Sequence, residues 1–444
     1  MYLRFCGDNK KVYFCSLFKL DVSYFYMKKL YLLIISIFAS ATLFSQTVVT
    51  IEQCQQWAVS QTSANVQKDL NGQILRTNFQ NAGSHLYPKL SINGRFAYES
   101  ADVPTISPFD QNPEWARMQY HIGLDLEQVL FDGCKMFYGR QYATLQNDAE
   151  IYKIELSMNE VKAQVINLYL SLLIIDKQID IIQNVQSTFD DQLKQLRVLY
   201  KEGVIPQNDV SQLELEALKM EQNHDELQAK RESIISTLSI LTGQDLSQAT
   251  FVMPELSDFS ATAPSNRLEF SIFENQLKQM EFQRKLHFSN SLPKISLFAT
   301  GGYGRPDYQF YFSRPDWYYM AGVSLRIPVI DWAKSSGVAK VIGIQKQILE
   351  SQEADFKKSN QIAIQDKLNE IKRLEHLIVL DKAINEKYAE LTKTYSSQLA
   401  NGTATVTDYI RQHNEELTSR MNQEIHNIQL LKAKYELMAL RGEL

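Results

Sequence analysis

The chain has 444 residues, 44% of them hydrophobic and 22% charged, with 46 basic against 51 acidic side chains. Its formal net charge of −5 argues against a nucleic-acid-binding protein, because neutralising phosphates requires clustered Lys and Arg. The four cysteines are too few for a disulfide scaffold, and neither they nor the seven histidines show metal-ligand spacing. The sequence also lacks a Gly-rich phosphate loop and a hydrolase motif. We therefore expect no enzyme, no metal and no cofactor.

The N-terminal region predicts export. Two lysines precede an apolar run over residues 30–44, which small and polar residues follow, and this order is typical of a secretory signal peptide. The run is shorter than the roughly 20 residues of a membrane-spanning helix. We expect residues 1–45 to be an upstream extension plus this signal, with Met27 as the true start and cleavage after Ala41 or Ser45.

A heptad pattern predicts a long helix in the first half of the mature chain. Apolar residues between Ile151 and Ile182 recur in alternating steps of three and four, which keeps one apolar stripe facing a partner helix. No Pro occurs from about Phe137 to Tyr200, and a helix of that length is roughly 95 Å long. An ordinary globular core does not need such a rod.

A turn over residues 203–206 then reverses the chain, and a second apolar stripe predicts a return helix antiparallel to the first. Asn208 or Asp209 is the expected N-cap of this return helix. His224 and Arg231 interrupt its apolar stripe. Isolated polar residues at such positions more often set the register of a coiled coil, or face a water-filled space, than bind a ligand.

Four segments alternate apolar with polar residues and are predicted to be strands. They cover about residues 87–100, 118–131, 293–304 and 318–330. Each is roughly 10–13 residues long, which is enough to cross a bilayer when tilted, and aromatic residues crowd their ends as at a membrane interface. Five polar residues are expected to face a wet barrel lumen: Asn93, Arg95, Asp125, Glu127 and Arg326.

An internal repeat divides the mature chain into two halves. Residues 88–92 are echoed by 293–297, residues 123–132 by 322–331, and the turn at 203–209 by 402–408. Three matches in the same order at the same structural junctions are not expected by chance. We predict a first repeat over residues 46–245 with a helical hairpin at 136–245, a linker over 246–264, and a second repeat over 265–444 with a hairpin at 335–444.

Four strands are too few to close a transmembrane barrel. An open sheet edge in hydrocarbon leaves backbone groups without hydrogen bonds, and eight strands are the usual minimum for closure. At least two chains are therefore required. Because the signal directs export, the barrel is expected in the outer membrane and the rods in the periplasm, as a passive conduit.

The residues resemble the TolC family of outer-membrane efflux proteins, also called outer membrane factors. The resemblance covers about residues 46–444 and is carried by Phe131-Asp132-Gly133, by residues 328–332 (PVIDW), by the Gly-x5-Asp turns and by the repeat. It implies a mixed α/β membrane protein: a homotrimer with one 12-stranded barrel above a tunnel of coiled helical hairpins. It further implies the exit duct of a tripartite efflux or type I secretion system.

The resemblance also implies partners. The hairpin tips would dock a periplasmic adaptor (membrane fusion) protein that connects to an inner-membrane pump of RND or ABC type. The tip positions are Gly203, Val204, Ile205, Asp209, Val210, Gly402, Thr403, Thr405 and Asp408. Plain turn chemistry explains the same residue types, with Gly in the turn and Asp as a helix cap.

A periplasmic entrance constriction is a further expectation from the resemblance. Asp408 occupies a position that is acidic in some members, whereas the second acidic position of that pattern is Arg411 here. An acidic, cation-attracting gate and an Asp408–Arg411 ion pair are both open. The alternative function is a secreted or periplasmic coiled-coil scaffold without a pore, which the heptads alone would permit and the four strands argue against.

Overall fold

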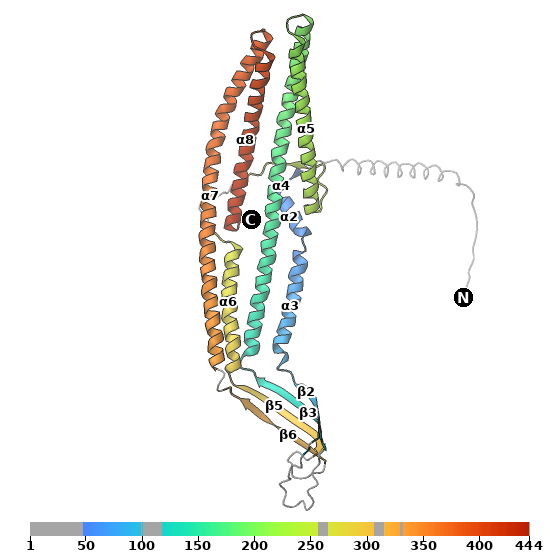
Figure 1. Cartoon of the computed structure of the whole chain (residues 1–444), viewed down its shortest axis with the longest axis vertical. Helices are drawn as coiled ribbons and strands as arrows, with labels where there is room; N and C mark the ends of the chain where they lie inside the picture. The colour runs from blue at the N-terminus through green and yellow to red at the C-terminus, as the bar shows by residue number, and fades with distance from the viewer. Residues whose placement is uncertain are drawn as a thin grey trace, which may run out of the picture.

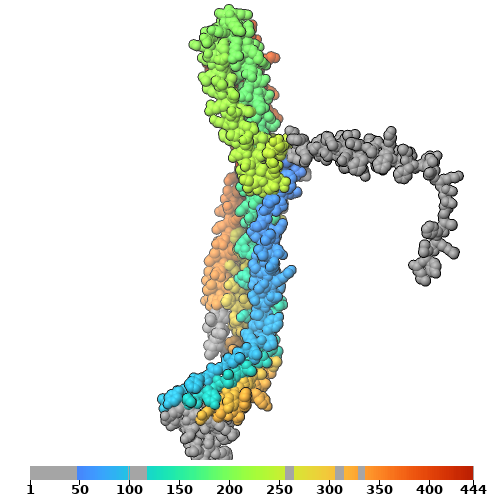
Figure 2. Space-filling view, turned by 90° about the vertical axis from the view of Figure 1, so that its right-hand side faces the viewer, coloured from blue at the N-terminus to red at the C-terminus, as the bar shows by residue number. Residues whose placement is uncertain are grey.

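The computed structural model describes residues 48–98, 100, 118–255, 265–305, 315–328 and 332–443. The expected signal peptide, Asp331 and most of the loops between paired strands lie outside these residues. The described chain is elongated, with long helices that end in two hairpin tips and a small sheet at the opposite end (Figure 1). Figure 2 shows that this sheet is set at an angle to the helices.

Two helical hairpins form most of the molecule. The first consists of α4 (Lys135–Lys201, 67 residues) and α5 (Gln207–Thr242, 36 residues), and the second of α7 (Trp332–Ala400, 69 residues) and α8 (Val406–Arg441, 36 residues). At 1.5 Å per residue, α4 and α7 are each about 100 Å long. The expected N-cap of α5 was wrong: Pro206 occupies this position and Asp209 lies in the first turn, because Pro is compatible with the extended backbone that precedes a helix.

Two shorter helices complete the pairing along the rods. The helices α3 (Ala64–Ser84) and α6 (Leu268–Phe288) have 21 residues each and lie along the sheet-proximal halves of α4 and α7 (Figure 1). They occupy the length that the return helices leave uncovered. The short α2 (Ile51–Gln61) packs on α4 and α5 midway along the molecule. Each long helix is therefore paired over nearly its whole length.

One four-stranded antiparallel sheet lies beneath the rods. Its order is β2 (Lys89–Tyr98), β3 (Met118–Phe131), β5 (Lys294–Arg305) and β6 (Asp316–Arg326). The central pairing of β3 with β5 joins the two repeats, and β2 and β6 are the two edges. Strand β6 starts two residues before the predicted strand and ends at Arg326, ahead of a proline that has no N–H for a sheet hydrogen bond.

A middle belt ties the N-terminal part of the described chain to the rods. Strand β1 (Val48–Val49) pairs in parallel with β4 (Thr250–Phe251), a strand within the segment expected to be a plain linker. The buried Tyr169 hydroxyl on α4 lies 2.8 Å from the carbonyl oxygens of both Val49 and Val252, and it accepts from the Val252 N–H. Burial raises the pKa of Tyr169 and keeps this hydroxyl protonated.

The heptad stripes form the core of the hairpins. On α4 the stripe buries Ile182, Phe189 and Leu196 against Leu213 of α5 and Tyr409 of α8. The polar interruptions pair across the helices: Arg231 Nε donates to Asp176 Oδ1 at 2.6 Å, and His224 lies 3.3 Å from Gln183. Among the described residues, no helix is long and apolar enough to cross a membrane.

Candidate functional site

Both hairpin tips end their long helix with the same left-handed glycine turn. Gly203 has a φ of 74° and Gly402 a φ of 67°, a conformation that costs other residues energy. In the first tip the Val204 N–H bonds back to the Leu199 carbonyl at 2.9 Å, and Thr403 makes the equivalent bond in the second. This is the Schellman C-cap, which satisfies the last helical carbonyls. The repeated glycines thus have a definite folding role.

The tips differ in how the return helix begins. In the second tip the Thr405 hydroxyl accepts from the Asp408 N–H at 3.1 Å and donates to its carboxylate at 2.7 Å. Arg411 also lies 3.4 Å from Asp408, so that the ion-pair interpretation holds within this chain. In the first tip Pro206 has no such side-chain cap. Because Asp408 is held by a hydroxyl and a guanidinium, it is not an isolated acidic charge.

The predicted tip residues are not equally accessible. Val204 is 60% exposed, and Gly203, Gly402, Thr403 and Thr405 are also at the surface. Val210, in contrast, is only 7% exposed and belongs to the hairpin core. Its place in the predicted docking set is therefore not supported, because an apolar side chain in the core has no face to offer a partner. Ile205 and Asp209 are half-buried.

Three polar contacts join the two hairpins near their tips. Gln192 of α4 donates to Ser396 of α7 at 3.1 Å. Thr407 of α8 donates to Gln212 of α5 at 2.8 Å, and Asn414 of α8 donates to Glu216 of α5 at 2.9 Å. The two tips of one chain are thus held side by side by two hydrogen bonds between neutral side chains and one to a carboxylate. The sequence did not point to these residues, because each looks like an ordinary polar position on a helix surface.

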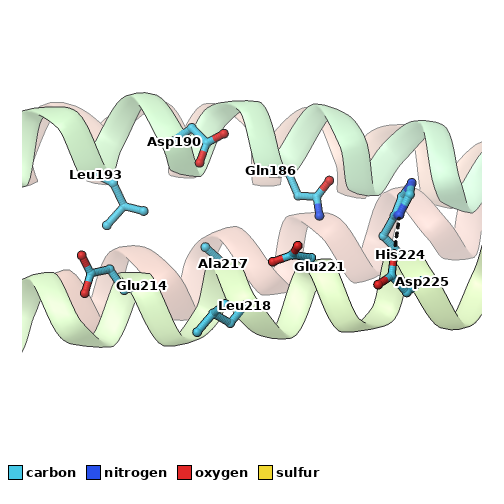
Figure 3. A pocket seen from close by; sticks show the side chains of 9 residues that line it. All are labelled: Gln186, Asp190, Leu193, Glu214, Ala217, Leu218, Glu221, His224 and Asp225. Carbon is cyan, nitrogen blue, oxygen red and sulfur yellow. Dashed lines mark hydrogen bonds and ion pairs between the residues drawn. The ribbon is translucent and has the colours of Figure 1, made fainter.

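An acidic groove of about 680 Å³ lies between α4 and α5 (Figure 3). Carboxylates from both helices line it: Asp190, Glu214, Glu221 and Asp225. Leu193, Ala217 and the exposed Leu218 also line it, together with Gln186 and His224. The sequence carried a signal for this groove, because Glu214, Glu221 and Asp225 follow one another in steps of seven and four and so share a helix face.

The join between sheet and rods is built on Asp132. Its carboxylate accepts from the backbone N–H groups of Lys135 and Met136, at 3.1 and 2.8 Å, and lies 2.7 Å from His85 at the end of α3. Burial opposes ionisation, but these hydrogen bonds prevail and hold the pKa of Asp132 below its usual value. Asp132 therefore caps α4 and joins it to α3.

Gly133 sets the close approach at the same join. It has a φ of 71°, and an added Cβ would lie 2.6 Å from the carbonyl oxygen of Ser289. Only glycine fits between the two backbones without displacement. Asp132 and Gly133 of the motif Phe131-Asp132-Gly133 thus hold the start of α4 close to His85 and Ser289.

One face of the sheet carries the five residues expected to line a lumen. The register puts Asn93, Asp125 and Arg326 on the same face as Arg95 and Glu127. Asp125 accepts hydrogen bonds from Asn93 and from Thr300 of β5, which sequence reasoning did not single out. Among the described residues, no group of three or more His, Cys, Asp or Glu is arranged to hold a metal ion.

A polar bridge crosses the same face. His121 of β3 and Tyr318 of β6 lie 2.8 Å apart across the intervening strand β5. Their rings reach over Gly302, where an added Cβ would lie 2.9 Å from the Tyr318 hydroxyl. The glycine is thus required for this contact.

The opposite face is apolar and exposed. Ile92 is 73% exposed and Phe96 69%, and Ile122, Val323 and Leu325 are also exposed. A contiguous apolar surface of this kind marks contact with a membrane or with another protein.

Comparison with solved structures identifies the class of fold. The chain is similar to the outer membrane protein VceC of Vibrio cholerae, with 14% identity over 88% of this chain and 96% of that one and a TM-score of 0.66. It is equally similar to the CmeC outer membrane channel of Campylobacter jejuni, with 14% identity over 88% and 85% of the two chains and a TM-score of 0.65. The fold is therefore that of the outer membrane factors, the TolC-type channels.

A third solved structure extends this result. The MtrE outer membrane channel of Neisseria gonorrhoeae, in its open state, matches with 14% identity over 88% of this chain and 89% of that one, at a TM-score of 0.61. No family model matches the sequence, and no curated protein does. At these identities the likeness is one of fold, and these neighbours are channels rather than enzymes.

Proposed function

We propose that this protein is the outer-membrane exit duct of a tripartite efflux or type I secretion system. Three copies join their sheets into one 12-stranded barrel, and their hairpins form a tunnel through the periplasm. Solutes pass without chemical change from an inner-membrane pump to the outside. The likeness of fold to outer membrane channels supports this proposal.

The observation that carries the proposal is the open four-stranded sheet with one apolar and one polar face. Strands of 10, 14, 12 and 11 residues suit a tilted membrane crossing. The edges β2 and β6 run antiparallel to each other, as closure of β6 onto β2 of the next copy requires. A pore-free scaffold has no use for this arrangement.

We further propose that the tips and the acidic groove dock the periplasmic adaptor. Glu214 is paired with Arg197 at 2.8 Å, and Asp225 lies 3.4 Å from His224. The four groove carboxylates still outnumber the cations beside them, and they fit an adaptor surface rich in Lys and Arg, which would be steered to them electrostatically. Reversing Glu221 and Asp225 to Lys should weaken adaptor capture in a pull-down. Glu353 and Asp355 on α7 are matched carboxylates outside the groove, and their reversal should leave capture unchanged.

Membrane fractionation and purified pores test the main proposal. The mature protein should fractionate with the outer membrane, elute in detergent with the mass of three chains, and open pores in planar bilayers. A scaffold would instead leave the cell in the soluble fraction after osmotic release. Recovery of the protein in that soluble fraction would overturn the exit-duct function.

A further inference from the structure

One histidine is buried where the two hairpins meet. His413 of α8 is 8% exposed, and neither of its ring nitrogens has a hydrogen-bond partner within the described residues. Its ring centroid lies 5.0 Å from that of Phe189 on α4 and 5.7 Å from that of Tyr409. Both aromatic residues belong to the core that joins the first hairpin to the second. The imidazole of His413 is therefore part of an apolar contact between hairpins.

The other six histidines, all within the described residues, are placed differently. Four of them contact a polar side chain and two are exposed. The contacts are His85 with Asp132, His121 with Tyr318, His224 with Asp225 and His426 with Asp381, and the exposed residues are His287 and His376. In contrast, His413 would have to carry a proton inside an apolar contact.

The charged groups on α8 and α5 are engaged elsewhere. On α8, Glu416 favours a protonated His413 and Arg420 disfavours it, and these two side chains pair with each other. On α5, the Glu216 carboxylate accepts from Asn414 at 2.9 Å and lies 3.1 Å from Lys219. An imidazolium at position 413 would therefore compete for Glu416 with a guanidinium that already holds it.

The α4 and α7 helices offer no better partner. The residues one turn from Phe189 on α4 are uncharged (Val185, Gln186, Gln192 and Leu193), and the adjacent Asp190 and Asp191 are exposed. On α7 the titratable groups at this level are the phenols of Tyr388, which donates to Glu415, and Tyr395. The exposed Lys387 and Glu390 of α7 pair with each other at 2.9 Å.

Protonation of His413 therefore opposes packing of α8 on α4. Burial holds the pKa of His413 below its ordinary value of about 6.5. Since the packed state disfavours the proton, this packing has its full strength above about pH 6.5 and weakens as the pH falls below that value. Moving α8 away from α4 would return the charged ring to water and remove the penalty. Acid thus favours separated hairpins.

Further buried polar atoms of the second hairpin lack partners. They are Gln412 Nε2 and Asn414 Oδ1, which flank His413 in the chain, and Thr392 Oγ1, one helical turn from Tyr388. A buried polar atom without a hydrogen bond raises the free energy of the packed state, and contact with water removes this cost. Entry of water at this level is therefore less unfavourable than in the apolar core of each hairpin.

We propose that His413 makes the contact between the hairpins sensitive to pH, so that its protonation separates α8 from α4 and widens the periplasmic end of the duct. This inference rests on the proposed function, because three copies around one axis turn separated hairpin tips into a wider entrance. Outer-membrane porins hold water-filled channels, through which protons of an acidified medium reach the periplasm. Histidine is the side chain whose charge changes in this pH range.

Single-channel recording of the mature protein in planar bilayers tests the effect on the duct. As the pH on the periplasmic side is lowered from 8 to 5, wild-type conductance should rise with a midpoint at or below about pH 6.5. His413→Phe keeps an aromatic ring between Phe189 and Tyr409 and should lose this rise. His376→Gln, at an exposed position on α7, is the matched control and should keep it. A wild type without the rise, or a Phe variant that retains it, would overturn the proposal.

Distances between the two tips of one chain test the movement itself. Spin labels are attached at Val204→Cys and Thr403→Cys, in a chain whose Cys54 and Cys134 are replaced by alanine, and labelled chains are diluted with unlabelled ones. The distance between the labels should lengthen in acid in this background and stay constant when His413→Phe is added. An acid-induced rise in conductance at constant tip distance would place the titrating group elsewhere and contradict the role of His413.

A disulfide across the contact decides the matter if the Phe variant does not fold. Gln192 and Ser396 lie 3.1 Å apart across the two hairpins, and Gln192→Cys with Ser396→Cys should lock them together under oxidising conditions. The locked channel retains His413 but should lose the acid response, and reduction should restore it. A locked channel that still responds to acid would overturn the proposal.

The same measurements keep the two proposals apart. Wild-type protein that opens no pore would overturn the exit-duct function, while the tip distances in detergent would still test the movement. Pores whose conductance and tip distance do not change with pH would overturn the role of His413 alone.

Discussion

The rods bury their apolar residues within one chain, whereas the sheet leaves its apolar residues exposed. Phe189 on α4 is 0% exposed and packs within the hairpin core, whereas Phe96 on β2 is 69% exposed. The rods therefore complete their core inside one chain, while the sheet leaves its apolar face for another surface. We therefore assign the stability of the single chain to the rods, and the proposed membrane insertion and assembly to the sheet.

A matched pair of phenylalanine substitutions tests this division most strongly. Phe189→Ala should lower the free energy of unfolding by about 3–5 kcal/mol, because it leaves a cavity in the hairpin core. Phe96→Ala should change it by less than about 0.5 kcal/mol, yet reduce recovery in the outer membrane. Thermal and denaturant unfolding in detergent measures the first effect and membrane fractionation the second. Equal destabilisation by both variants would show that the sheet is packed as a core.

The Asp132 join between the two regions should contribute a smaller amount. Asp132→Ala removes the cap of α4 and should cost about 1–2 kcal/mol. Because the pKa of Asp132 is lowered in the folded chain, its charge contributes stability above the unfolded value of about 3.9. That contribution is lost as the pH falls through the lower folded value.

Unfolding measured between pH 7 and pH 2 tests the direction of this pH dependence of stability. The wild type should lose stability at the acidic end, and Asp132→Asn should lose less over the same interval. A wild type and an Asn variant with parallel pH profiles would contradict the assignment.

Replacing the tip glycines should destabilise the fold about as much as Asp132→Ala does. It should impair export more strongly than it lowers stability. A Cβ at Gly203 or Gly402 would meet no atom within 4 Å, so that only the left-handed backbone opposes substitution, by about 1–2 kcal/mol each. Replacing both by bulky residues should abolish export while the trimer and its membrane insertion persist. Export of a pump substrate and native gel mobility measure the two effects. Loss of the trimer would show that export fails because the fold is lost, and would contradict a separate docking role of the tips.

The smallest effect is expected at the Asp408–Arg411 pair. Both side chains are exposed at the tip, and exposed pairs contribute little. Arg411→Ala should change the free energy of unfolding by less than about 0.5 kcal/mol. If this variant instead alters the conductance of the purified pore, Arg411 faces the periplasmic entrance. Conductance is therefore recorded as well, because unfolding does not report on the pore.

The rods could be predicted from the sequence because the pattern that defines each helix lies within one continuous segment. Steps of three and four between Ile151 and Ile182 define the buried stripe of α4, and period-two alternation located β2 and β3 nearly to the residue. The repeat located the glycines of both tips, although their left-handed geometry required coordinates. Val210 shows the limit, since only residues 207–209 separate the turn at 203–206 from the buried stripe.

Contacts between distant segments could not be predicted from the sequence. The pairing of β1 with β4 involves two residues on each side and leaves no periodic signal. The His121–Tyr318 contact depends on a glycine in a third strand, and the hydrogen bonds of Tyr169 depend on where the linker returns. Each is set by tertiary geometry, so that no pattern along one segment encodes it.

The belt at Tyr169 has a practical consequence for tagging. Since Val49 is bonded to this tyrosine midway along the helices, the described residues begin on the side of the molecule and at neither end. A fluorophore or affinity sequence fused just before residue 48 would therefore be attached to the flank of the long helices. The hairpin tips and the sheet, at the two ends of the molecule, lie away from this attachment point.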